Sequence, residues 1–242
     1  MKRPDKIYST PLHEIVDFRF DEKVAAVFPD MLNRSVPGYG LMITNIGILA
    51  GRYTQAGSRC YDLGCSLGAA TLAMRQRITV EDCHIVAVDN SKAMIERAQQ
   101  LLEGDAATAP VELVCADILD VRINNASVVV LNLTLQFIPV DRRSELIKNI
   151  HAGLRPGGIL ILAEKVAFDD EARQELLTDL HHEFKRAQGY SDLEVSQKRT
   201  ALENVMIPES LDIHIERLGQ AGFAVVEPWF QCFNFASLVA FK

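Results

Sequence analysis

The sequence predicts an α/β fold: a doubly wound, mostly parallel sheet of seven strands with helices on both faces and an antiparallel last strand. Three observations carry this prediction. Short apolar runs rich in Val, Ile and Leu alternate with longer amphipathic segments over most of the chain. Glycine-containing turns separate the two kinds of segment. The last two apolar runs lie too close together for a parallel crossover, which needs a dozen or more residues.

The elements follow in order from these patterns. After an extended start that contains prolines, two amphipathic helices are expected, and "PGYG" forms the turn between them. Strand and helix then alternate, and "LRPGG" marks a turn before the fifth strand. The expected helices cover 21–36, 40–54, 69–77, 91–104 and 141–154, and the expected strands cover 58–64, 84–90, 111–118, 126–134 and 157–166.

The C-terminal third departs from strict alternation. A helix over 209–222 ends at a glycine, and strands follow at 223–230 and 233–242. Between the fifth strand and this helix lies a helical insertion at about 165–208, with helices expected at 169–189 and 191–206. An insertion there overhangs the carboxyl ends of the strands, where ligands bind in open α/β sheets, and suits a lid or a dimer contact. We expect one domain, 1–242, with an N-terminal helical extension at about 1–56.

Composition and charge narrow the possible functions. The formal net charge is −7, and no long Lys/Arg block is present, so direct nucleic-acid binding is not expected. The short basic runs "HHEFKRAQ" and "SQKR" are interpreted as solvated helix faces. No signal-peptide pattern opens the sequence and no apolar run has membrane-spanning length, which favours a soluble, cytoplasmic protein without membrane contact.

The cysteines and histidines form no recognisable metal-binding pattern. The spacing C-x-x-C is absent, and the six histidines do not pair with the cysteines at ligand spacing, so no metal is expected. An odd, scattered set of cysteines in apolar runs is typical of small core residues in a reducing compartment. They are Cys60, Cys65, Cys83, Cys115 and Cys232.

The stretch "YDLGCSLG", residues 61–68, is a candidate ligand-binding loop between a strand and a helix. Gly64 allows a tight turn after the strand, and Gly68 allows the next helix to pack closely. The spacing fails the G-x-G-x-x-G dinucleotide fingerprint, and no Lys-Ser/Thr pair follows as in a P-loop. With Asp62 two residues before the first glycine, the loop suits a ligand with a cationic group. A merely structural turn remains the alternative.

Polar residues also stand where three further strands end. Asp89 follows the second strand and suits the two ribose hydroxyls of a nucleoside, Asp117 follows the third and suits an adenine amino group, and Asn132 emerges from the fourth. Because the carboxyl ends of parallel strands meet at one edge, these side chains are expected to converge. For each residue alone, a simple preference of Asp and Asn for turns explains the position equally well.

Taken together, Gly64, Asp89 and Asp117 resemble the cofactor positions of the class I S-adenosylmethionine-dependent methyltransferases, which have a Rossmann-like fold. A closer resemblance covers nearly the whole chain. The stretches "FDEKVAAVFPDMLNRSVPGYG", "YDLGCSLGAAT", "DNSKAMIERA", "VVLNLTLQF", "HHEFKRAQGYSDLEVSQKR", "LENVM" and "WFQCFNFASLVA" are similar to those of the carboxy-S-adenosyl-L-methionine synthases.

This resemblance implies a specific activity. Members of the family convert S-adenosyl-L-methionine and prephenate to carboxy-S-adenosyl-L-methionine and phenylpyruvate, and a separate enzyme uses the product to modify wobble uridine in tRNA. A homodimer is implied, without direct contact to RNA. A conventional methyltransferase is the alternative, although the acceptor motif N-P-P-Y is absent and "NLTLQF" stands in its place. A ligand-binding or scaffold protein on the same fold also remains open.

The resemblance also implies site residues, with Arg199 thought to reach over from the partner subunit. A guanidinium repels a sulfonium but pairs with a carboxylate, so Arg199 is expected to favour the carboxylated product. Tyr39 is expected to hydrogen-bond a carboxylate or pack against the adenosyl group. Arg199 and Tyr39 are the catalytic candidates. The ligand-binding candidates are Tyr39, Gly64, Cys65, Ser66, Asp89, Asn90, Asp117, Ile118, Asn132 and Arg199.

The implied chemistry requires positioning and exclusion of water more than a strong acid or base. Decarboxylation and dehydration of prephenate yield carbon dioxide and a base. That base can take a proton from the S-methyl group, and the resulting carbanion can attack carbon dioxide before either escapes.

Overall fold

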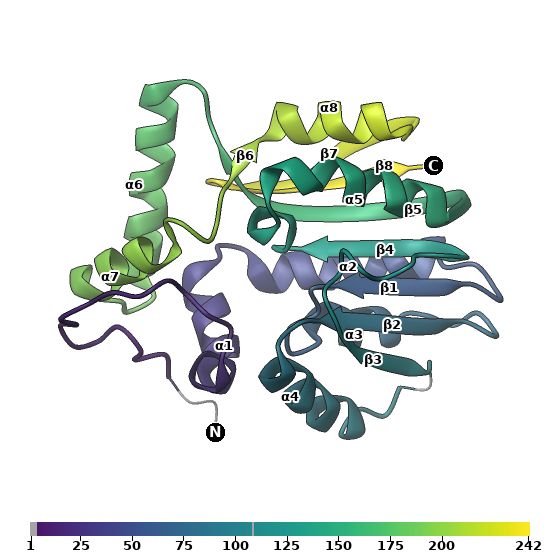
Figure 1. Ribbon diagram of the computed structural model, residues 1–242, viewed down its shortest axis with the longest axis horizontal. Coiled ribbons are helices and arrows are strands. Elements are labelled where there is room, and N and C mark those ends of the chain that lie inside the picture. Colours follow the sequence, from purple (N-terminus) through teal and green to yellow (C-terminus); the bar gives the residue numbers. More distant parts are fainter. Residues whose placement is uncertain (1–3, 108) are drawn as a thin grey trace.

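A single sheet runs through the protein, shown in Figure 1 with its strands lying horizontally. The structure is a computed structural model that describes residues 4–107 and 109–242. Seven strands follow the order β3-β2-β1-β4-β5-β8-β7. Strands β1 to β5 pair in parallel, as predicted. Their bounds are β1 Arg59–Leu63, β2 His84–Asp89, β3 Val111–Cys115, β4 Ala126–Asn132, β5 Leu154–Ala167, β7 Val225–Cys232 and β8 Phe235–Phe241.

The last strand runs antiparallel to both of its neighbours, which confirms the prediction made from the short connection between the last two strands. Two details differ from the sequence expectation. A two-residue strand, β6 (Glu209–Ser210), pairs with the end of β5 as an eighth member of the sheet. Strand β5 begins at Leu154, because "LRPGG" extends the strand through an irregular register beside β4 instead of forming a separate turn.

Two helical layers cover the sheet. Helices α2 (Tyr39–Tyr53) and α3 (Ala69–Arg75) lie over one face, where alternate β4 and β5 residues such as Val130 and Ile161 enter the same core. Helices α5 (Val140–Gly153) and α8 (Leu211–Ala221) cover the other face. Helix α4 (Lys92–Glu103) follows β2, and Ser91 caps it by accepting a hydrogen bond from the Met94 amide.

The carboxyl ends of the parallel strands point towards a group of helices outside the sheet. Figure 1 shows α1 (Glu22–Ser35), α6 (Glu171–Ala187) and α7 (Asp192–Leu202) gathered at this edge. Ser191 and Glu194 form a reciprocal capping box at the start of α7, which explains why that helix begins there. The inserted helices therefore lie where the sequence placed them, beyond the strand ends.

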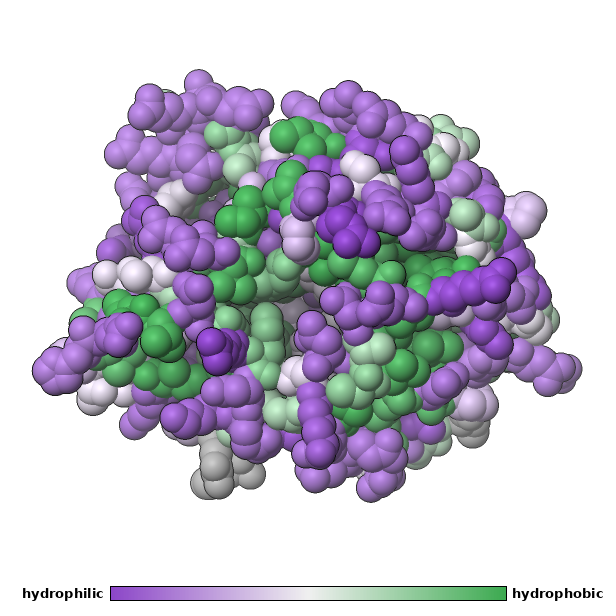
Figure 2. Space-filling model, in the orientation of Figure 1, coloured by the Kyte–Doolittle hydropathy of each residue, from purple (hydrophilic) through white to green (hydrophobic). Residues whose placement is uncertain are grey.

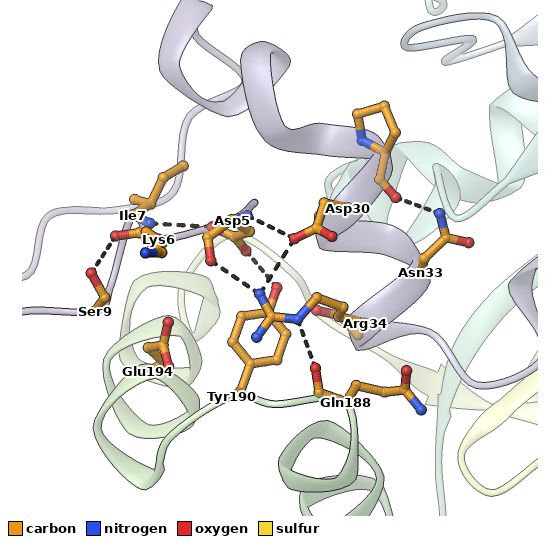
Figure 3. Close-up of polar contacts among 12 residues, drawn as sticks. Asp5, Lys6, Ile7, Ser9, Asp30, Asn33, Arg34, Gln188, Tyr190 and Glu194 are labelled. Atoms are coloured by element: carbon orange, nitrogen blue, oxygen red, sulfur yellow. Dashed lines mark hydrogen bonds and ion pairs between the residues drawn. The ribbon is translucent and has the colours of Figure 1, made fainter. Parts of the chain in front are cut away.

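The N-terminal segment is tied to α1 and to the α6–α7 connection, as Figure 3 shows. The Asp5 amide donates to Asp30, and the Tyr190 hydroxyl donates to the Asp5 carboxylate at 2.5 Å. The Arg34 guanidinium stacks on the Tyr190 ring at 3.8 Å and donates to the Gln188 carbonyl. These contacts join segments far apart in the sequence into one support beside the strand ends.

Two interpretations of the sequence need correction. The runs "HHEFKRAQ" and "SQKR" are not simply solvated, because His181, Lys185 and Lys198 are buried against the rest of the protein. Helix α6 turns one side inwards, and the polar pattern of the run conceals this. The cysteines are also not all core residues: Cys115 is exposed, because β3 is an edge strand.

Candidate functional site

The glycine-rich loop joins β1 to α3. The Gly64 and Cys65 amides both donate to the Val88 carbonyl of β2, at 2.8 and 2.9 Å. Gly64 has φ +81°, and a Cβ at this position would lie 2.4 Å from the Thr134 side chain. Both the backbone conformation and the close approach therefore require glycine here.

Asp89, at the end of β2, holds the loop directly. One carboxylate oxygen accepts from the Ser66 amide and the other from the Ser91 amide, both at 2.9 Å. Burial raises the pKa of Asp89, and the bonds from Ser91 and Ser66 oppose this rise. Ser66 itself has φ +48°, so the loop turns sharply at the residue that contacts the carboxylate. The predicted pair of glycine loop and acid is thus assembled.

The end of β3 adjoins the same place. The Ala116 amide donates to the Asp89 carbonyl at 3.1 Å, which brings Asp117 next to the end of β2. Asp117 and Asn90 are exposed, and Asp117 accepts from the Leu119 amide at 2.9 Å. Ile118 is buried in the core beneath. An exposed carboxylate and an apolar side chain side by side suit a planar, amino-bearing ring such as adenine.

The end of β4 contributes Asn132 and the segment after it. The Oδ1 atom of Asn132 is buried without a hydrogen-bond partner among the described residues. An unpaired buried acceptor costs about 1–3 kcal/mol, so a ligand that donates a hydrogen bond, such as an ammonium group, suits this position. The Thr134 side chain lies against Gly64, which places the two strand ends together.

Glu164 supports this segment, and sequence reasoning missed it. It is 2% exposed, and its carboxyl oxygens accept from the Thr134, Leu135 and Gln136 amides at 2.8–3.2 Å. Those amides begin the 3₁₀ turn Leu135–Phe137. Burial raises the pKa of Glu164 to about 8, against the lowering effect of the amides. The only sequence signal was an acid at the end of an apolar strand.

Tyr39 begins α2 beside the glycine loop. Burial, and then the nearby charge of Asp62, raise the pKa of its hydroxyl, which therefore remains a neutral donor. Asp62 is 1% exposed and accepts from the Thr71 hydroxyl at 2.5 Å. Burial raises the pKa of Asp62 to about 6. Asp62 and Asp89 thus supply two buried acids that a cationic ligand would favour in their ionised form.

Arg199 belongs to helix α7 and not to one of the strand ends. It is exposed on α7, and its charge acts on Lys165 at the end of β5 and on His182 of α6 in the same chain. Within the described parts of the chain, no hydrogen bond or ion pair joins it to the residues of the glycine loop. Its expected action across a dimer remains a prediction, whereas its neighbours Lys165, His182 and Lys185 were not identified from the sequence.

Two further features of the described residues bear on the class of protein. In residues 4–107 and 109–242, no helix has both the length and the apolar character needed to cross a membrane. In the same residues, no group of three or more His, Cys, Asp or Glu side chains is arranged to hold a metal ion. Surface hollows of about 540 and 440 Å³ lie near Asn124 and Cys83, away from the strand ends described above.

The sheet order and the antiparallel last strand make this fold that of a class I S-adenosylmethionine-dependent methyltransferase. Residues 61–158 match the family model described as "Methyltransferase domain". The solved human N-acetylserotonin methyltransferase, in complex with SAM, has the same fold, with a TM-score of 0.60 and 17% identity over 91% of this chain and 55% of that one.

Relatives that match over the full length identify the family within this class of proteins. The carboxy-S-adenosyl-L-methionine synthase of Geobacter sp. strain M21 is 67% identical over 242 residues, covering 100% of this chain and 99% of the relative. That of Aliivibrio fischeri strain ES114 is 58% identical over 242 residues and covers 100% of both chains. The chain belongs to the carboxy-S-adenosyl-L-methionine synthase family, and it is a transferase of the S-adenosylmethionine-dependent class.

The raised pKa of Asp62 predicts how cofactor affinity depends on pH. A cationic ligand favours the carboxylate and lowers this pKa, so S-adenosylmethionine affinity should rise with pH up to about 6 and then level off. Asp62→Asn should weaken binding at neutral pH and flatten the rise. Calorimetric titrations between about pH 5 and 8 measure both effects. Asp212→Asn, at an exposed position on α8, is the control, and an unchanged pH profile in Asp62→Asn would contradict the role of Asp62.

Proposed function

We propose that this protein converts S-adenosyl-L-methionine and prephenate to carboxy-S-adenosyl-L-methionine and phenylpyruvate. The observation that carries the proposal is its 67% identity, over the full length, to a relative named as a carboxy-S-adenosyl-L-methionine synthase. The reaction balances: prephenate loses carbon dioxide and hydroxide, hydroxide takes a proton from the S-methyl group, and carbon dioxide bonds to that carbon. The product in turn supplies tRNA wobble-uridine modification by another enzyme.

The strand-end residues suit the adenosyl sulfonium. We assign Asp89 to the ribose hydroxyls, Asp117 to the adenine, and the Gly64–Ser66 loop with Asn132 to the amino-acid end. Asp89 retains free lone pairs after accepting one hydrogen bond on each oxygen, and the unpaired Asn132 oxygen fits the ligand's ammonium. When bound, S-adenosylmethionine supplies the acidified methyl group.

Tyr39 and Arg199 are assigned to the carboxylates. The neutral Tyr39 hydroxyl can donate to a carboxylate without repelling the sulfonium, and Arg199 can pair with the carboxylate formed on the methyl carbon. We further propose that the enzyme acts in the cytoplasm as a homodimer, without contacting RNA, and that Arg199 lies at the subunit interface. The net charge of −7 supports the absence of RNA binding.

A conventional methyltransferase is the second candidate, because the matched domain model and the solved neighbour share that description. Mass spectrometry separates the two. The purified protein is incubated with S-adenosylmethionine, with and without prephenate, and its small molecules are weighed. We expect carboxy-S-adenosylmethionine and phenylpyruvate only with prephenate. Unmodified cofactor in both reactions would exclude the proposal, and S-adenosylhomocysteine formed with an added acceptor would support a methyltransferase.

Arg199→Ala tests the assigned carboxylate pairing. We expect affinity for carboxy-S-adenosylmethionine to fall by about 10- to 100-fold, because a charge-assisted pair is lost, while S-adenosylmethionine affinity stays unchanged or rises. Calorimetric titration with each ligand measures the two affinities. An equal loss for both ligands would mean that Arg199 holds a part they share. Arg186→Ala, an exposed arginine on α6, is the control.

A further inference from the structure

Four basic side chains lie near the end of β5, and none of the described acids pairs with them. We call Lys165, His182, Lys185 and Arg199 the cationic cluster; they come from β5, α6 and α7. The charge of Arg199 acts on Lys165, the charges of Lys185, Arg199 and Lys165 act on His182, and the charge of Lys165 acts on Lys185. The cluster is therefore one electrostatic unit assembled from three elements.

The burial of Lys185 makes this arrangement unusual. Lys185 is 8% exposed. In the described parts of the chain, no carboxylate lies within ion-pair distance of Lys165, Lys185 or Arg199. Burial, then the charges of Lys198 and Lys165, lower the pKa of Lys185 to about 7. Most of the Lys185 side chain is buried, and no acid in the described residues balances its charge, which disfavours the folded state. A purely structural role therefore does not account for Lys185.

The neighbouring Lys198 shows the contrast. It is equally buried, but its ammonium group lies 3.6 Å from the Asp5 carboxylate and donates to the Ser35 hydroxyl at 3.0 Å. Asp5 in turn accepts from Tyr190. The charge of Lys198 is thus paired within the protein, whereas Lys185 has no acidic partner among the described residues.

The register of the sheet connects the cluster to the proposed reaction site. Asn132 pairs with Ala163, and Lys165 lies two residues further along β5. Side chains alternate between the two faces of a sheet, so Asn132 is on the same face as Val130, two residues before it. In the same way, Lys165 is on the same face as Ile161 and Ala163. This is the face covered by α2, whose first residue is Tyr39. Lys165 and Asn132 therefore border the same end of that face.

Aromatic side chains lie beside the cluster. Phe235 is the register partner of Lys165, and the ring of His181 packs edge-on against it with centroids 5.1 Å apart. Phe235 shares its apolar core with Tyr39 and Trp229, whose indole Nε1 is buried without a partner among the described residues. In Figure 2 the surface is hollowed near the centre of the view, between the sheet and the outer helices.

We propose that the cationic cluster binds the carboxylates of the anionic co-substrate, with Lys165 and Lys185 as its principal contacts and the aromatic side chains against its ring. This inference rests on the proposed function. It explains why one site can serve both sides of the reaction: of the two carboxylates on the co-substrate, one remains on phenylpyruvate and the other is bonded to the former S-methyl carbon at the end. The carboxylate that is transferred thus moves only from one carbon to another within the same field of cations.

The binding test compares lysine variants of the full-length protein. Lys165→Met and Lys185→Met are titrated with prephenate in the presence of saturating S-adenosylhomocysteine. We expect prephenate affinity to fall at least tenfold in each, phenylpyruvate affinity to fall less, and S-adenosylhomocysteine affinity to stay within about twofold. Lys185→Arg, which keeps the charge, should retain most of the affinity, and Lys148→Met on the exposed side of α5 is the control. Unchanged prephenate affinity in both Met variants would overturn the proposal.

Stability and pH provide readouts that a structural lysine would not give. Lys185→Met should raise the melting temperature, whereas Lys198→Met should lower it by removing the positive charge that pairs with Asp5. A lowered melting temperature in Lys185→Met would refute the proposal. Lys185 is surrounded by the basic groups of Lys165, Lys198, His182 and Arg199, and a bound anion favours its protonated form. Wild-type prephenate affinity should therefore fall as pH rises above about 7. If the wild type makes no carboxylated product, the proposed function fails; if it does and the variants keep the wild-type KM for prephenate, only the cluster proposal fails.

Discussion

Gly64→Ala is expected to remove most of the S-adenosylmethionine affinity and to destabilise the fold. A side chain at φ +81° costs about 1–2 kcal/mol. The new Cβ would also lie 2.4 Å from Thr134, a β-branched residue with little rotamer freedom, which adds about 1–3 kcal/mol of overpacking. Because the Thr134 amide donates to Glu164, the strain reaches the segment that follows Asn132.

The matched control for Gly64→Ala is another glycine with open space. Gly219 lies in α8, and a Cβ there would meet nothing within 4 Å. Gly219→Ala should stabilise the helix by up to about 1 kcal/mol and leave ligand affinity unchanged. Urea denaturation and calorimetric titration of both variants measure the two effects. Normal stability and affinity in Gly64→Ala would show that the loop accommodates a side chain and that its glycine is not required.

The parts of the fold that local patterns specify were predictable. A β-branched apolar run such as residues 126–132 has few alternatives to a buried strand, and the carboxyl ends of parallel strands must share an edge. The convergence of Gly64, Asp89 and Asp117 follows from that geometry. The antiparallel course of β8 follows from the few residues that separate it from β7. In these cases, chain connectivity leaves almost no freedom.

The inward-facing lysines of α6 and α7 could not be predicted because their burial depends on contacts between distant segments. Lys185 and Lys198 have the spacing of solvated helix residues, and only the packing of α6 and α7 against α1 and the N-terminal segment turns them inwards. The run "HHEFKRAQ" shows that a charged stretch of sequence does not by itself mean that its side chains are exposed to solvent. The same reason hides Glu164, whose three amide donors come from about 30 residues earlier in the chain.

Behind the site, one buried arginine joins the two segments that support it. Arg143 on α5 is 0% exposed and pairs with Glu209 of β6 at 2.5 Å. Its guanidinium also donates to the carbonyls of Gln136 and Ile207, at 3.2 and 2.9 Å. The Gln136 side chain in turn accepts from the Lys165 amide. Arg143 thus fixes the segment after β4 to the return from the insertion.

Arg143→Leu should therefore lower the free energy of unfolding by about 3–5 kcal/mol, because it leaves buried carbonyls unpaired and Glu209 with Arg217 alone. Arg142→Leu is the matched control on the same helix. Arg142 is about half exposed, and among the described residues it forms an ion pair with Glu145 alone, three residues on, so its loss should change stability by less than about 1 kcal/mol. Urea denaturation compares the two variants. Equally small losses of unfolding free energy in both variants would mean that solvent or rearranged side chains donate to the Gln136 and Ile207 carbonyls. The Arg143–Glu209 pair would then not be needed to fix the segments behind the site.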